Sequence, residues 1–343
     1  MAEQWIRRVG TARKGFRYVR DDNREVRDAR TLRRIDLVRV PPAWRDVHLA
    51  PSASRTVQAW GYDARGRKQY RYHERAVTRR ELRKHHRVRQ LAKALPRIRR
   101  ILRGQSRGAS LTRDTASAIA IRLISESLFR PGSDRYEREN RSYGLTTLRK
   151  RHVGLDARGA VFTYAGKSGK RQRQFVTNPE LVRLVARLVR TPGARLFRYR
   201  TDGEWCDLDA RTLMDYLRRT AGPYAVKDFR TWGATLRAAT VLTELGAPRS
   251  PTEAKRNVAL AMRIVASELG NTPAICRASY VHPMVVARYL DAGETVRLSR
   301  LARAPRRADS FAHSAEERAL IAFLGRHFPE RRRRLRDAMA RAA

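Results

Sequence analysis

Short runs that alternate apolar and polar residues occupy the first part of the chain, from about residue 16 to residue 73. Four of them are separated by turn residues: FRYVR, IDLVRV, TVQAWGYD and KQYRYH. Alternation over four to eight residues, rich in Val, Ile, Tyr and Trp, predicts β-strands. We therefore expect residues 1–77 to form a small β-rich lobe built on an antiparallel sheet.

The stretch GYDARGRKQYRYH is typical of a β-hairpin, with residues 64–66 forming a short loop that contains glycine. Successive side chains of a strand point to opposite faces. The second arm would thus place Gln69 and Arg71 on one face, and Tyr70 and Tyr72 on the other.

After Val77 the apolar residues recur with a helical period, through RRELRKHHRVRQLAKALPRIRRIL, until GQSRGAS at 104–110 interrupts the pattern. This change predicts a domain boundary near residue 78, with the Gly/Ser-rich break as a second candidate. Residues 78–343 would then form a larger lobe.

The larger lobe is predicted to be mainly helical. DTASAIAIRLISESLF has helical spacing, and two further helical runs stop at Gly246 and Gly270, as helices with a glycine C-cap do. One β-hairpin interrupts the helices at about 159–177, with Gly-Lys-Ser-Gly-Lys at its tip. The fold class expected is α+β, a small antiparallel lobe followed by a larger helical one.

Composition indicates the partner. The 343 residues include 76 Lys and Arg against 33 Asp and Glu, a net charge of +43, which favours a polyanion such as duplex DNA or RNA. No apolar run of about 18 residues predicts a membrane span. Cys206 and Cys276 lack metal-ligand spacing, so we expect no zinc site and a reducing, cytoplasmic compartment.

The tip sequence GKSGK resembles the end of a nucleotide-binding P-loop, but its context does not fit. The consensus requires a glycine where this chain has Val161, and it joins a strand to a helix rather than two strands. We therefore expect no nucleotide cofactor. The chain has only nine lysines, and Lys167 at this tip could reach a DNA groove or a phosphate, or simply be solvated.

Two arginines stand near helix ends. Arg230, in AVKDFRTWGAT, is placed at the start of a helix, where free N–H groups favour an anion, although it could instead pair with Asp228. Arg130 follows a helix and precedes a Pro-Gly turn. Taken singly, each is compatible with an ordinary structural arginine.

The segment ELGNTPAICRASYVHP brings a tyrosine to the end of a short helix. Gly270 ends the preceding helix, Thr272 is a good N-cap, and Pro273 suits the first helical turn. Tyr280 would lie two turns along, with Arg277 one turn below on the same face. Considered alone, such a tyrosine is more often a packing residue than a reactive one.

Several motifs occur in a fixed order: PPAWRDV, GYDARGRKQYRYH, FRPGSDRYERENRSYGLTTLRKRHV, GKSGK, KDFRTWGAT and LGNTPAICRASYVHP. From about residue 38 to residue 290 the chain resembles poxvirus-like bacterial type IB DNA topoisomerases. The resemblance implies a β lobe and a mostly helical catalytic lobe that together clamp double-stranded DNA, and an enzyme that relaxes supercoils by cutting one strand transiently.

By motif position, the resemblance implies that Tyr280 is the nucleophile that forms a 3′-phosphotyrosyl bond and that Lys167 is the general acid. Arg130 and Arg230 would hold the phosphate. Asn271 stands where eukaryotic and viral members have histidine; an amide still donates a hydrogen bond to a phosphate oxygen, but it carries no charge.

The resemblance also implies major-groove contacts by Gln69, Tyr70 and Tyr72, although alternation along the strand points some of these side chains away from DNA. The complete set of DNA-binding residues expected beyond the catalytic ones is Arg67, Gln69, Tyr70, Tyr72, Lys170 and Arg277.

This chemistry is coherent. A tyrosine with a pKa of about 10 is only about 0.1% phenolate at pH 7, so attack requires nearby positive charge. A lysine can donate a proton near neutral pH, whereas arginine cannot. We expect no metal, no cofactor and no ATP, and, from the resemblance, a monomer associated with the nucleoid.

Two alternatives remain at this point. A tyrosine recombinase uses a similar Arg, Lys and Tyr set. However, recombinases usually carry His-x-x-Arg where this chain has KDFR, and their N-terminal lobe is helical rather than β-rich. A basic DNA-binding protein without enzymatic activity would also account for the net charge. The basic run Arg331–Arg334 is predicted to be a solvated helix face or tail.

Overall fold

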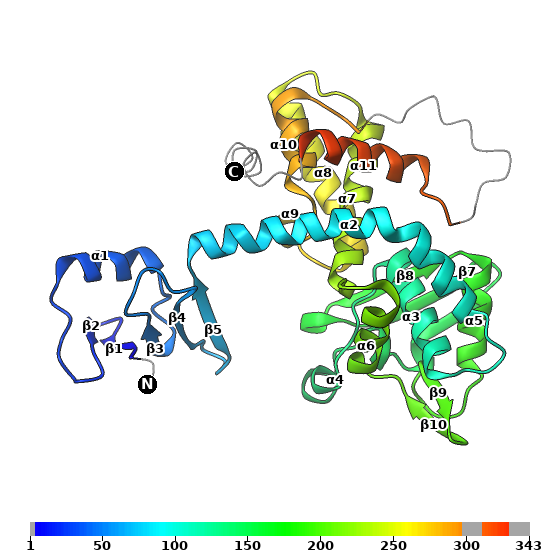
Figure 1. The fold of residues 1–343 in the computed structure, drawn as a ribbon, viewed down its shortest axis with the longest axis horizontal. Helices are drawn as coiled ribbons and strands as arrows, with labels where there is room; N and C mark the ends of the chain where they lie inside the picture. Colours follow the sequence, from blue (N-terminus) through cyan, green and yellow to red (C-terminus); the bar gives the residue numbers. More distant parts are fainter. Residues whose placement is uncertain (1–3, 297–310, 329–343) are drawn as a thin grey trace. The chain divides into compact units, whose positions relative to one another are not determined.

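A computed structural model describes residues 4–296 and 311–328. The chain divides into two compact units, Met1–Arg83 and Lys84–Ala343, which are described separately below. A small antiparallel sheet characterises the first and helices form the bulk of the second (Figure 1). The predicted combination of a β-rich region followed by a mainly helical one is confirmed.

The first unit contains a five-stranded antiparallel sheet in the order β2-β1-β3-β4-β5. Its strands are β1 (Ile6–Thr11), β2 (Gly15–Val19), β3 (Arg45–Leu49), β4 (Val57–Tyr62) and β5 (Lys68–Tyr72). β4 and β5 form the predicted hairpin, with Trp60 opposite Tyr70 and Gly61 opposite Gln69. The Tyr70 and Tyr72 rings lie on one face, 6.0 Å apart.

The prediction of a strand at IDLVRV was wrong, because these residues belong to helix α1 (Ala29–Val38). Asp28 caps the helix by accepting from the Thr31 backbone N–H at 2.8 Å. The three-residue spacing puts Leu32, Ile35 and Val38 on one face of the helix. This face packs into the core of the sheet.

Helix α2 (Glu74–Ser106) continues through the division between the units, which falls after Arg83. The predicted interruption at 104–110 is real: α2 ends there, and α3 (Arg113–Ser127) begins after Thr112, whose side chain caps it. Helix α3 is the central helix of the second unit, packed against α5, α6, α7 and two strands.

The other α-helices that the structure describes in the second unit are α4 (Asp134–Asn140), α5 (Pro179–Val189), α6 (Ala210–Ala221), α7 (Val226–Leu245), α8 (Pro251–Leu269), α9 (Pro273–Ser279), α10 (Pro283–Ala292) and α11 (Ala315–His327). The predicted stops are confirmed, since Gly246 and Gly270 are the C-caps of α7 and α8. Gly270 has a φ of +65°, a conformation that glycine adopts without strain.

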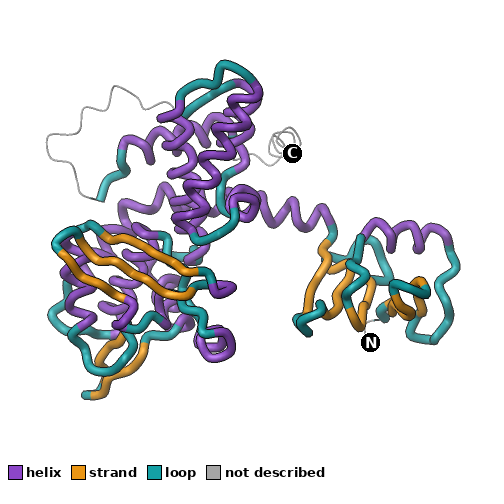
Figure 2. The backbone as a smooth tube through the Cα atoms, turned by 180° about the vertical axis from the view of Figure 1, so that it is seen from behind, coloured by secondary structure: helices purple, strands orange, loops and turns teal. Residues whose placement is uncertain are grey.

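The predicted hairpin at 159–177 is also present, as β7 (Gly159–Ala165) and β8 (Arg171–Val176). A third strand, β6 (Val153–Asp156), pairs with β7, and β9 (Arg198–Thr201) pairs with β10 (Glu204–Asp207). The sequence patterns did not indicate these additional strands. Figure 2 shows both sheets at the surface of the helical unit.

Candidate active site

Tyr280 is the C-cap residue of α9, and its backbone N–H donates to the Cys276 carbonyl at 3.0 Å. As predicted, Thr272 caps this helix through the Ile275 N–H, and Pro273 occupies its first turn. The Thr235 hydroxyl, from α7, lies 3.2 Å from the Tyr280 carbonyl and accepts from the His282 N–H at 3.0 Å. The same hydroxyl lies 2.7 Å from the Thr231 carbonyl. Hydrogen bonds therefore fix the backbone N–H of Tyr280 and that of His282, two residues later.

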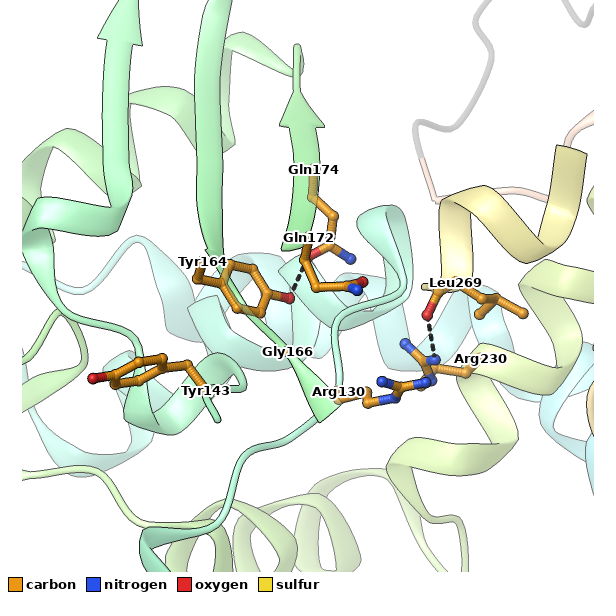
Figure 3. Close-up of a pocket in the computed structure, with 8 residues that line it drawn as sticks. All are labelled: Arg130, Tyr143, Tyr164, Gly166, Gln172, Gln174, Arg230 and Leu269. Atoms are coloured by element: carbon orange, nitrogen blue, oxygen red, sulfur yellow. Dashed lines mark hydrogen bonds between the residues drawn. The ribbon is translucent and has the colours of Figure 1, made fainter. Parts of the chain in front are cut away.

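Arg230 is buried, with 2% of its surface exposed. Its guanidinium donates to the carbonyl oxygens of Leu128 and Leu269, the latter at 3.1 Å (Figure 3). The guanidinium carbon lies 5.3 Å from the centre of the Tyr280 ring. These bonds fix the charge beside the phenol.

The alternative that Arg230 pairs with Asp228 was wrong. Asp228 instead accepts two hydrogen bonds from Arg87, at 2.8 and 2.9 Å, and one from the Ala225 N–H at the start of α7. Because α7 begins at Val226, Arg230 lies beyond the first turn, and the free N–H groups of the helix start are not beside it.

Arg130 stands in the loop after α3, on a backbone that is tightly packed. Its carbonyl accepts from the Leu145 N–H at 2.8 Å, and a Cβ atom on Gly144 would lie 2.5 Å from the Gly132 nitrogen. The side chain donates to the Gly270 carbonyl at 3.2 Å and to the Asn271 side-chain oxygen. Thus two loops from distant parts of the sequence meet at this arginine.

The environment of Tyr280 favours its ionised form. Burial raises the pKa of the phenol, but Arg230, Arg130 and Lys227 together outweigh burial, so the net pKa lies below the usual value. The Lys227 ammonium lies 5.7 Å from the ring centre. Sequence reasoning missed Lys227, although its position three residues before Arg230 places it on the same helix face.

Two buried donors in this cluster have no hydrogen-bond partner within the described residues: Arg230 Nε and Asn271 Nδ2. Buried polar groups are normally satisfied, so unused donors beside two arginines indicate a place for an anion. A small pocket beside Arg230 is lined by both arginines and by Tyr164, Gln172 and others (Figure 3).

Lys167 and Lys170 lie at the tip of the β7–β8 hairpin, as predicted. Both are exposed, and within the described part of the chain neither ammonium makes an ion pair or hydrogen bond. Gly166, immediately before Lys167, lines the pocket. The loop thus reaches the cluster through its backbone, with the lysine side chain at its outer end.

The predicted groove residues belong to the first unit. Tyr70 and Tyr72 are each 44% exposed. Arg67 Nε and Gln69 Nε2 both donate to Asp63, at 2.8 and 3.0 Å. Hydrogen bonding from Arg67 is the main reason that the pKa of this carboxyl is lowered to about 2. The two tyrosines and Arg67 are therefore exposed, whereas Gln69 is partly buried and its amide nitrogen is bonded to Asp63.

The remaining observations concern Arg277, the basic run near the C-terminus, membrane spans and metal sites. Arg277 is exposed on α9, while the basic run at 331–334 lies outside the described residues. No described helix is long and apolar enough to cross a membrane. Within residues 4–296 and 311–328, no group of three His, Cys, Asp or Glu side chains could hold a metal ion.

Comparison with known proteins identifies the family. Residues 68–300 match the family described as "Eukaryotic DNA topoisomerase I, catalytic core", and residues 15–63 match "Bacterial DNA topoisomerase IB, N-terminal domain". The chain belongs to the type IB DNA topoisomerases, a family of isomerases.

Two of the relatives that match are viral proteins. The DNA topoisomerase 1B of Acanthamoeba polyphaga mimivirus is 30% identical over 275 residues, which cover 78% of this chain and 82% of the relative. The DNA topoisomerase 1B of vaccinia virus (strain Copenhagen) is 23% identical over 239 residues, covering 67% and 72%.

Proposed function

We propose that this protein relaxes supercoiled double-stranded DNA by cutting and rejoining one strand through a 3′-phosphotyrosyl bond at Tyr280. The observation that carries this proposal is the phenol with Arg230 and Lys227 at 5.3 and 5.7 Å from its ring. A tyrosine with only a packing role would require neither a lowered pKa nor nearby hydrogen-bond donors that lack partners.

In the proposed cleavage step the Tyr280 phenol loses its proton to water, and its oxygen attacks the phosphorus of the scissile diester. The P–O5′ bond breaks, and the departing 5′-oxygen takes a proton from the Lys167 ammonium. Arg130, Arg230 and the Asn271 amide stabilise the charge on the non-bridging oxygens, where loss of one such donor costs about 3–4 kcal/mol. Religation is the reverse of this step.

The phosphotyrosyl bond retains the energy of the diester, so rejoining requires neither ATP nor another cofactor. Lys167 provides the proton and the arginines provide the charge, so the mechanism needs no metal ion. We further propose that the two units clamp duplex DNA as a monomer associated with the nucleoid in the cytoplasm. The net charge of +43 supports DNA as the partner.

The test is relaxation of supercoiled plasmid without ATP or metal by wild type and Tyr280→Phe, with denaturant added to trap covalent protein–DNA complexes. Tyr199→Phe, in β9, is the matched control. We expect wild type and the control to relax and to be trapped, and Tyr280→Phe to bind DNA without doing either.

Relaxation by Tyr280→Phe at the wild-type rate would refute the assignment of the nucleophile. Absence of both relaxation and trapping in the wild type would favour a binding protein without catalysis. Activity confined to plasmids that carry a recombination site would favour a recombinase.

A further inference from the structure

Gln172 occupies an unusual position between two loops of the candidate site. It lies on β8, is 8% exposed and lines the pocket (Figure 3). A Cβ atom on Gly166 would lie 2.5 Å from its Cγ, and one on Gly270 would lie 1.7 Å from its Oε1. With the Gln172 side chain in this position, neither glycine has room for a Cβ atom.

Each of these glycines immediately precedes a proposed catalytic residue. Gly166 precedes Lys167, and Gly270 precedes Asn271. The Gln172 side chain therefore fills the space between the backbone of the hairpin tip and the turn that follows α8. Close packing of this kind transmits a small shift of one loop to the other.

The amide of Gln172 also bonds to the hairpin tip itself. Its Nε2 donates to the Lys170 carbonyl at 3.3 Å. The same carbonyl accepts from the Gly166 N–H at 2.8 Å, the bond that closes the tip. Gln172 thus supports the closure of the loop that carries Lys167.

The two loops differ in their other supports. The turn after α8 is held by Arg230 on the Leu269 carbonyl and by Arg130 on the Gly270 carbonyl. At the hairpin tip residues 167–170 are all exposed. Removal of Gln172 should consequently loosen the tip more than the turn.

We infer that Gln172 is a positioning residue that sets the place of the Lys167 ammonium by anchoring the hairpin tip against Gly270. This inference rests on the proposed role of Lys167 as proton donor to the 5′-oxygen. A general acid contributes about 10²–10⁴-fold to a rate, and a shift of about 1 Å can cost about 10²-fold. The expected defect is therefore in proton transfer rather than in nucleophilic attack.

The experiment measures single-turnover cleavage, at saturating protein, of two duplexes. One has the ordinary bridging 5′-oxygen at the scissile phosphate, and the other has sulfur in its place. A thiolate leaves without a proton because the pKa of a thiol is only about 8.5. Gln172→Ala should cleave the oxygen duplex about 10- to 100-fold more slowly than wild type and the sulfur duplex at nearly the wild-type rate.

Three further variants make the result specific. Gln172→Met keeps the length of the side chain but lacks the amide, and should show a smaller defect of the same kind. Arg173→Ala, on the opposite face of β8, should cleave both duplexes like wild type. Lys167→Ala is the reference variant. It should cleave the oxygen duplex slowly and the sulfur duplex at nearly the wild-type rate.

The outcomes separate the two hypotheses. If Lys167→Ala cleaves the sulfur duplex as slowly as the oxygen duplex, the proposed role of Lys167 is wrong. If Lys167→Ala behaves as expected, the inference about Gln172 fails when Gln172→Ala cleaves the oxygen duplex normally or is equally slow on both. Should Gln172→Ala not fold, as judged by circular dichroism, the same criteria apply to Gln172→Met.

Discussion

Arg130 donates a hydrogen bond to the side-chain oxygen of Asn271, so that oxygen is already occupied. The Asn271 amide nitrogen is buried and has no partner within the described residues. The arginine thereby orients the amide, leaving its N–H group as the part that can meet a ligand. Asn271 can thus serve as an oriented, neutral hydrogen-bond donor.

This orientation predicts that Asn271→Asp is worse than Asn271→Ala. Aspartate keeps the contact with Arg130, but it has no donor and adds a negative charge beside the phosphate. Loss of a preorganised donor lowers the rate about 10²–10³-fold. We expect the alanine variant to be slower than wild type by that factor and the aspartate variant to be slower still. Single-turnover cleavage rates provide the measurement, and equal rates for the two variants would contradict the predicted orientation.

Lys227 is predicted to tune the ionisation of Tyr280. Because its charge lowers the pKa of the phenol, Lys227→Met should raise that pKa. Cleavage should then be slower at neutral pH and recover as the pH is raised, so the pH–rate profile shifts to higher pH. Lys255→Met, an exposed substitution on α8, is the control, and an unshifted profile for Lys227→Met would refute this role.

Much of this site could be predicted from sequence because its residues lie next to local signals. The glycine after α8, the N-cap Thr272 and Pro273 determine where Tyr280 falls, and a glycine-containing tip determines where Lys167 falls. These signals act over a few residues, so they can be interpreted without the fold. The short apolar run IDLVRV lacked such a signal in our interpretation, and its helix was missed even though Asp28 caps it.

Contacts between distant segments could not be predicted in this way. The pairing of Arg87 with Asp228 joins residues 141 positions apart, and Arg130 meets Asn271 across the same separation. Gln172 appeared as one polar residue of an alternating strand, and nothing local distinguished it from Gln174. Such roles depend on which loops the fold brings together.

Thr235 is predicted to fix the backbone around Tyr280. It is 1% exposed, and its hydroxyl is an acceptor for the buried His282 N–H. Thr235→Val keeps the shape but leaves that N–H unsatisfied, which costs about 1–3 kcal/mol. We expect a lower free energy of unfolding and slower cleavage, measured by urea titration and single-turnover assay.

Thr235→Ser provides the matched control, because it retains the hydroxyl and removes only a methyl group. It should restore most of the cleavage rate that Thr235→Val loses. If both variants are equally slow, packing of the methyl group rather than the hydrogen bonds holds Tyr280 in place.

His282, two residues after Tyr280, is buried in a cationic environment. Its ring lies 4.5 Å from that of His85 and 4.8 Å from that of Phe328. Burial, followed by the charges of Lys84 and Arg89, lowers its pKa from 6.5 to about 3. Its Nδ1 accepts from the Met284 N–H at the start of α10, so the ring is neutral in the folded protein.

This lowered pKa predicts acid sensitivity. Below pH 6.5 the unfolded chain binds a proton at His282 that the folded protein does not bind, so stability is complete above that pH and declines as the pH falls toward 3. The slope for one such group approaches about 1.4 kcal/mol for each pH unit. His282→Asn keeps a side-chain acceptor for the cap but cannot titrate, and should reduce the slope of the free energy of unfolding against pH between 6 and 4, measured by urea titration. Burial also lowers the pKa of the adjacent His85, so part of the slope should remain. His86→Asn, on the partly exposed side of α2, is the matched control. If His282→Asn keeps the full wild-type slope, His282 is not the group responsible.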